Sequence, residues 1–206
     1  MAVHVPRQAL EGGPRDLKLH ASWFEEVILS MADDFQVPLH EVIPVRVFHE
    51  GETSSGRSYY NRLTRSIVLG GPVDRAAFVH EVSHHFAHCI TGKPPYWADQ
   101  ALAEYMEDYI LQETQTSRHL IRRMALAEDG SEVLSHLTRS AVDEGRGWGL
   151  MVVRYLFEDR WARRTMGEKI RLLLGLSEAE LSGLAPAVLE YCRRPDLLAG
   201  SGPTAR

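Results

Sequence analysis

Four histidines and one glutamate fall within nine positions of the chain, residues 80–88, which read HEVSHHFAH. The segment lies inside a predicted helix that begins at Pro72, because a proline suits the first helical position, where its missing N–H would have no partner. This helix is expected to end at about Ile90, before the helix-breaking segment TGKPP. A β-rich segment precedes it and a second predicted helix, residues 96–112, follows it. The pattern therefore indicates strands followed by two consecutive helices around the histidines.

The remaining segments predict an α+β fold. Apolar residues recur at helical spacing over residues 16–35. Residues 42–50 (VIPVRVFHE) and 57–71 (RSYYNRLTRSIVLGG) together predict two or three strands, the last of them at residues 66–69. Further helices are expected at residues 117–128, 131–143, 148–160, 166–175 and 177–192. We therefore expect a small antiparallel or mixed sheet followed by a helical C-terminal half.

Length and composition indicate one ordinary globular domain. The chain has 206 residues, of which 44% are apolar and 25% charged, enough to bury a core. We expect this domain to span residues 16–192, divided into residues 16–92 and a helical half, residues 93–192. Residues 1–15 and 193–206 are expected to be flexible.

Charge and hydropathy patterns argue against a nucleic-acid-binding, membrane-spanning or secreted protein. A net charge of −5 argues against a nucleic-acid partner, which requires clustered basic residues. No apolar run approaches the roughly 18 residues that predict a membrane span. The start of the chain lacks the apolar core of a secretory signal, so a cytoplasmic protein is expected. No oligomeric state is predicted.

His80, Glu81 and His84 form the pattern HExxH. Positions i and i+4 of a helix lie on one face, so both imidazoles can bind one cation. Zinc accepts nitrogen ligands at about 2.0–2.1 Å and, in catalytic sites, keeps a water among four ligands. Glu81 is rotated about 100° from His80, where it can act on that water as a general base. We predict a catalytic site for Zn²⁺, with another divalent metal as the alternative.

The other polar residues of the segment are expected to take no part in the chemistry. His85 lies off the face of the histidine pair and is expected to be exposed. His88 is one turn too far along the helix to share an ion with His80. Cys89 is expected to be a small buried side chain rather than a ligand.

The second helix carries YWADQALAEYMEDYI, residues 96–110, and here the sequence resembles the gluzincin metallopeptidases, the thermolysin-like and aminopeptidase-like enzymes. Their second helix often reads W-x-x-E-G-L-A-x-Y, in which the Glu is the third zinc ligand. The positions that match are Trp97, Leu102, Ala103 and Tyr105. Gln100 stands where the family has that Glu, and Ala101 where it has Gly. The resemblance covers roughly residues 60–175 and implies a zincin-like domain that hydrolyses a peptide or protein substrate.

The resemblance leaves two registers open for the third ligand. In one, Gln100 takes the ligand position and Glu104 is the outer carboxylate that orients a histidine. In the other, Glu104 is the ligand, twenty positions after His84 as in thermolysin-like enzymes, and Asp108 is the outer carboxylate. Chemistry favours Glu104, because a carboxylate brings charge that a neutral amide oxygen lacks. The residue-by-residue match favours Gln100.

Two further segments are similar to parts of the same family. Residues 146–161 (RGWGLMVVRYLFEDRW) look like the helix after the active site, where Arg146 replaces a tyrosine that stabilises the transition state. A guanidinium could take that role; a surface arginine is the alternative. The strand SIVLG, residues 66–70, is expected to be either the edge strand that pairs with a bound peptide or an internal strand.

Three functions are consistent with these patterns. The first is a small gluzincin-like metallopeptidase that uses a metal-activated water and Glu81. The second is a degenerate zincin-fold binding or regulatory protein, as Gln100 and Ala101 suggest. The third is a metalloenzyme that uses iron or manganese for other chemistry, since two histidines and one carboxylate also form non-haem iron sites.

Overall fold

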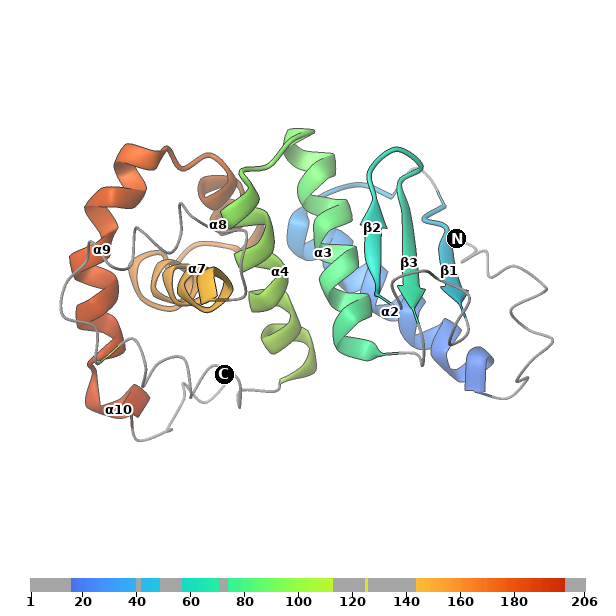
Figure 1. The fold of residues 1–206 in the computed structure, drawn as a ribbon, viewed down its shortest axis with the longest axis horizontal. Helices are drawn as coiled ribbons and strands as arrows, with labels where there is room; N and C mark the ends of the chain where they lie inside the picture. Colours follow the sequence, from blue (N-terminus) through green and yellow to red (C-terminus); the bar gives the residue numbers. More distant parts are fainter. Residues whose placement is uncertain are drawn as a thin grey trace. The chain divides into compact units, whose positions relative to one another are not determined.

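The structure is a computed structural model, and it describes residues 16–39, 42–48, 57–70, 74–112, 125 and 144–198. The chain divides into two compact units, residues 1–94 and 95–206 (Figure 1), whose placement relative to one another is not determined. The boundary falls within the range that the sequence assigned to a single domain. The described residues are mostly helical and include a three-stranded mixed sheet. The prediction of an α+β fold is therefore confirmed.

The sheet of the first unit contains β1 (Val45–Phe48), β2 (Tyr59–Asn61) and β3 (Ser66–Gly70). The strand order is β1-β3-β2, in which β3 is parallel to β1 and antiparallel to β2. The central strand is thus SIVLG, and its residues 66–69 are buried. Because both of its sides are already paired, β3 is not an edge that can receive a peptide strand. Of the two interpretations of this segment, the internal strand is correct.

Two helices complete the first unit: α2 (Asp16–Phe35), at the bounds that the apolar spacing predicted, and α3 (Arg75–Thr91). Helix α3 contacts β2 and β3, and α2 contacts α3 (Figure 1). Phe24 of α2 stacks on Phe78 of α3, with ring centroids 3.9 Å apart. Phe35 and Phe86 form a second contact between the same helices, with centroids at 5.4 Å. These fully buried rings hold α3 between the sheet and α2.

Helix α3 begins at Arg75, so the predicted start at Pro72 is wrong. Asp74 is the N-cap residue, with an extended backbone and a side chain that accepts a hydrogen bond from the Ala76 N–H at 2.9 Å. An aspartate cap satisfies one of the four N–H groups that a helix start leaves unbonded. At the other end Gly92 has a φ of +70°, and its N–H donates to the His88 carbonyl at 2.8 Å. Glycine tolerates this conformation without a steric penalty.

The second unit is helical over its described residues. Its elements are α4 (Tyr96–Leu111), α7 (Glu144–Arg154), the π-helix η1 (Tyr155–Arg160), α8 (Met166–Leu174), α9 (Glu178–Cys192) and α10 (Pro195–Leu198). Helix α4 contacts α7 and α8, and α7 contacts α9. Helix α10 falls within the segment predicted to be flexible. The helix predicted over 131–143, and that over 117–128 apart from residue 125, lie outside the described residues. No helix in the described ranges is long and apolar enough to cross a membrane.

A buried ion cluster joins four elements of this unit, α4, α7, η1 and α9. Arg154, 7% exposed, donates from Nη2 to Asp108 Oδ2 of α4 at 2.8 Å and from Nη1 to Glu158 Oε1 of η1 at 3.2 Å. The Tyr191 hydroxyl of α9 donates to Glu158 Oε2 at 2.7 Å. Burial lowers the pKa of the Arg154 guanidinium, but the two carboxylates more than offset this and raise it above its ordinary value. The arginine is therefore charged and bound on two sides.

Candidate metal centre

His80 and His84 lie one turn apart on α3, and their spacing can be tested against a shared metal ion. The two ring centroids are 4.7 Å apart and the ring planes are at 81°. With nitrogen–zinc bonds of about 2.0–2.1 Å the ion lies about 3.2 Å from each centroid, so rings bound at about 90–109° have centroids about 4.5–5.2 Å apart. The observed separation falls in this range. The centroid separation is therefore the one expected of two imidazoles bound to one zinc ion.

Glu81 is 8% exposed and lies in a run of seven consecutive buried residues, 81–87. Burying a carboxylate costs free energy unless charged or hydrogen-bonding groups compensate for the lost water. A buried glutamate adjacent to the histidine pair therefore favours a chemical role over a solvated surface position. Helical geometry directs it about 100° away from His80, which suits a base beside the histidine pair rather than a third ligand.

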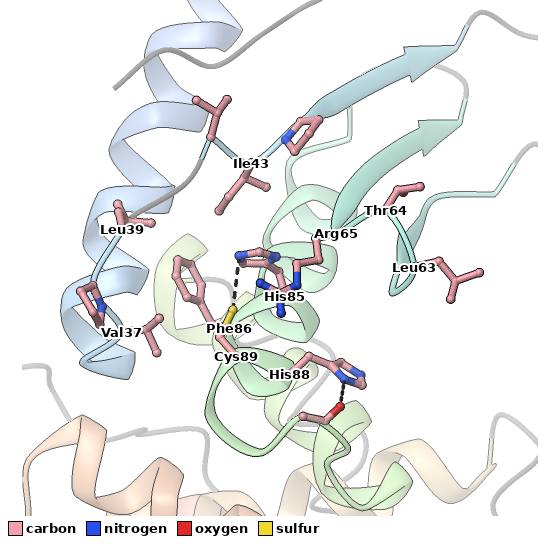
Figure 2. A pocket seen from close by; sticks show the side chains of 14 residues that line it. Val37, Leu39, Ile43, Leu63, Thr64, Arg65, His85, Phe86, His88 and Cys89 are labelled. Atoms are coloured by element: carbon pink, nitrogen blue, oxygen red, sulfur yellow. Dashed lines mark hydrogen bonds between the residues drawn. The ribbon is translucent and has the colours of Figure 1, made fainter.

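His85 is buried, with 8% of its surface exposed, so the prediction of an exposed side chain is wrong. Its ring meets Tyr60 of β2 edge-on at 5.5 Å, and its Nε2 lies 3.6 Å from the sulfur of Cys89 (Figure 2). Burial, the charge of Arg65 and the neighbouring His88 together lower the pKa of His85 to about 4. The contact with Tyr60 joins the helix to a strand residue that sequence spacing could not place beside it.

The side chain of His88 forms a hydrogen bond at the C-terminal end of its own helix. Its Nδ1 lies 3.0 Å from the carbonyl oxygen of Gly92, and because a carbonyl only accepts, the proton is on Nδ1. This bond satisfies one of the carbonyl groups beyond the last turn. Cys89, on the next position, is exposed, so the prediction that it is buried is wrong.

The two cysteines are expected to differ strongly in reactivity. Cys192 is buried in α9, and this burial raises its pKa to about 12. Only the thiolate reacts, and with that pKa about one Cys192 thiol in ten thousand is ionised at about pH 8. Ellman's reagent should therefore modify one thiol of the folded protein rapidly, and reaction at Cys192 should increase as the pH rises toward 12.

Single substitutions identify the reacting thiol. Cys89→Ala should abolish the rapid reaction, whereas Cys192→Ala should leave it unchanged, and unfolding in urea should release the second thiol in the unsubstituted protein. Two thiols that react at equal rates in the folded protein would contradict the burial of Cys192.

The candidates for the third ligand lie on α4, in the second unit. Gln100, Glu104 and Asp108 occupy successive turns of this helix, and Gln100 and Glu104 are half-buried. Asp108, the outer carboxylate of the second register, is bound by Arg154. The histidines belong to the other unit, so the choice between Gln100 and Glu104 stays a prediction.

The sequence interpretation also missed Arg154 and left Arg146 as a candidate. Arg146 lies in α7, but its side chain falls outside the described residues. Arg154 is the charged residue that interrupts the apolar stretch LMVVRYLF, residues 150–157. An arginine in such a stretch is a signal for a buried ion pair, and it could have identified the cluster with Asp108.

Among the residues that the structure describes, no group of three or more His, Cys, Asp or Glu side chains is placed to hold a metal ion. Comparison of the chain with protein-family models, with curated proteins and with solved structures gives no match.

Proposed function

We propose that this protein is a zinc-dependent hydrolase, of the gluzincin-like type that cleaves peptide bonds. The observation that carries the proposal is the pair His80 and His84, with ring centroids 4.7 Å apart, next to the buried carboxylate of Glu81. The three residues lie on one helix that fully buried aromatic rings pack against α2. This packing fixes the helix backbone and so the relative positions of the ligands and the base, as catalysis requires.

Each residue has a defined chemical task in this proposal. Zinc, when bound, acts as a Lewis acid that polarises a substrate carbonyl and lowers the pKa of water. His80 and His84 would each donate a ring-nitrogen lone pair to the ion. The Glu81 carboxylate accepts a proton from the attacking water and then delivers it to the nitrogen of the departing amine.

For the third ligand we propose Glu104, because its carboxylate supplies the charge that a zinc ion favours. Gln100 is the alternative that the family resemblance indicates. If Glu104 is the ligand, Asp108 is the outer carboxylate; its Oδ2 lies 2.8 Å from Nη2 of Arg154. Arg146 is proposed to stabilise the negative charge that develops on the substrate oxygen.

The test of this proposal is the metal content of the protein. Unsubstituted protein dialysed against zinc should retain one ion per chain by elemental analysis. His80→Ala and His84→Ala should each weaken zinc binding by more than the about 10–100-fold that loss of an outer partner costs. His20→Ala, which removes a histidine outside α3, is the matched control and should bind zinc as the unsubstituted protein does.

The same measurement assigns the third ligand and separates the alternatives. Glu104→Ala should weaken zinc binding more than Gln100→Ala does, and the reverse order would assign Gln100. Zinc retained without cleavage of any member of a peptide library would replace the hydrolase with a zincin-fold binding protein. Iron or manganese in protein purified without added zinc would instead indicate a metalloenzyme with other chemistry. Unchanged zinc binding in both histidine variants would overturn the site.

A further inference from the structure

The first unit contains a cavity of about 640 Å³, a size typical of small-molecule sites. Three parts of the unit line it: residues 37–39 and 42–44, which lie between α2 and β1, the turn at residues 63–65 between β2 and β3, and the C-terminal part of α3 with Gly92 (Figure 2). His80, Glu81 and His84 are not among the residues that line it. An inference about this cavity is therefore independent of the proposed metal site.

The cavity has an apolar side and a polar side. In Figure 2 the side chains of Val37, Leu39, Ile43 and Phe86 gather on one side. Ile43 and Phe86 are buried in the core of the unit and support this wall, whereas Val37 and Leu39 are half-buried and present apolar surface to the cavity. An apolar body bound there would be removed from water, which is the main source of favourable free energy in such sites.

The polar side is formed by Arg65, Thr64 and His85. Arg65 follows a tight turn in which the side-chain oxygen of Asn61 accepts hydrogen bonds from the N–H groups of Leu63 and Thr64, at 3.0 and 3.2 Å. The backbone of Arg65 has a φ of +49°, a conformation that costs free energy in a non-glycine residue and that clusters at ligand sites. None of the described residues that line the cavity is acidic.

His85 supplies the second observation that indicates a ligand. Its side chain is more than nine-tenths buried and lines the cavity. Its Nε2 contacts Cys89, but its Nδ1 is buried and has no hydrogen-bond partner among the described residues. A buried polar atom without a partner destabilises the folded protein. A ligand with a polar head in this cavity would remove that cost.

We infer that this cavity binds a small molecule with an apolar body and one carboxylate head, in which the head pairs with Arg65 and His85 and the body contacts Val37 and Leu39. A single guanidinium matches a single negative charge and can bind both carboxylate oxygens. A phosphate dianion would call for more than one cationic partner. The apolar wall excludes fully polar metabolites, because it gives their hydrogen-bonding groups no partners.

Octanoate is the probe that tests this inference, by isothermal titration of the full chain. Octanoate should bind, and octan-1-ol and octylamine, which have the same apolar chain without the negative charge, should bind at least tenfold more weakly. Arg65→Gln should weaken octanoate binding at least tenfold. Arg62→Gln, which removes an exposed arginine of the same turn that does not line the cavity, should not.

A second measurement uses Cys89, which lines the same cavity. Bound octanoate should slow alkylation of Cys89 in the unsubstituted protein, whether or not Arg65→Gln folds. No binding of octanoate, or equal binding of octanoate and octan-1-ol, would overturn the inference. Equal losses in Arg65→Gln and Arg62→Gln would also overturn it, since they would show a general effect of charge. None of these results depends on zinc or on hydrolysis.

Discussion

Glu81→Gln is expected to lower the rate of peptide hydrolysis by about 10²–10⁴-fold, the range that a positioned general base contributes. The amide has nearly the shape of the carboxylate but cannot accept the proton, so the chemical step is lost and the helix is retained. Zinc should stay bound, because His80 and His84 remain in place. The measurements are the turnover of a peptide library and the zinc content of the same preparation.

Measuring turnover and zinc content together distinguishes a general base from a residue with a structural role. Glu81 is 8% exposed, so a purely structural role would lower stability and metal content together with activity. Glu190→Gln, an exposed position on α9, is the matched control and should keep both zinc and turnover. Unchanged turnover in Glu81→Gln would exclude Glu81 as the base, and loss of zinc and activity at unchanged stability would assign it to the ligand set.

The sequence predicted the regular elements of this fold well where apolar spacing and helix breakers agree. Residues 16–35 form the predicted helix, and the second helix, predicted over 96–112, ends one residue early at Leu111. The predicted start of α3 was wrong because both a proline and an aspartate can mark the beginning of a helix. Here the side chain of Asp74 caps the helix and fixes its first residue. Helical spacing also cannot reveal that residues 155–160 form a π-helix, since the apolar pattern is nearly the same.

The candidate site was predictable only in part. The histidine pair follows from the i, i+4 spacing of one helix, so its geometry is local. The burial of His85 is not local, because its ring packs against Tyr60 of β2. The identity of the third ligand could not be predicted from the sequence, since Gln100 and Glu104 differ by one turn, about 5.4 Å along the helix axis.

Arg154→Met is expected to destabilise the second unit by about 3–5 kcal/mol, the cost of breaking a buried ion pair by removing one partner. Arg154 is bound by Asp108 and Glu158 at 2.8 and 3.2 Å, and its loss leaves two carboxylates without their countercharge. Methionine has a similar apolar length, so the loss of packing is small. The measurement is hydrogen exchange at the amides of α9, which reports on this unit alone.

Stability should be recovered when the whole cluster is made apolar. Arg154 Nε is buried without a hydrogen-bond partner among the described residues, so the cluster does not recover the full cost of removing its charges from water. Replacing Arg154, Asp108 and Glu158 by Met, Leu and Leu, with Tyr191→Phe, should therefore restore most of the stability that the single substitution loses. This recovery would show that the two carboxylates left without a countercharge cause the loss.

Arg194→Met is the matched control for the single substitution. Arg194 forms a pair of similar length with Asp196, 2.9 Å, but its side chain is 44% exposed. Water and salt screen such a pair, so its removal should leave exchange at α9 nearly unchanged. Equal effects of Arg154→Met and Arg194→Met would show that burial does not distinguish the two arginines, and the cluster would then have no special part in holding α4, η1 and α9 together.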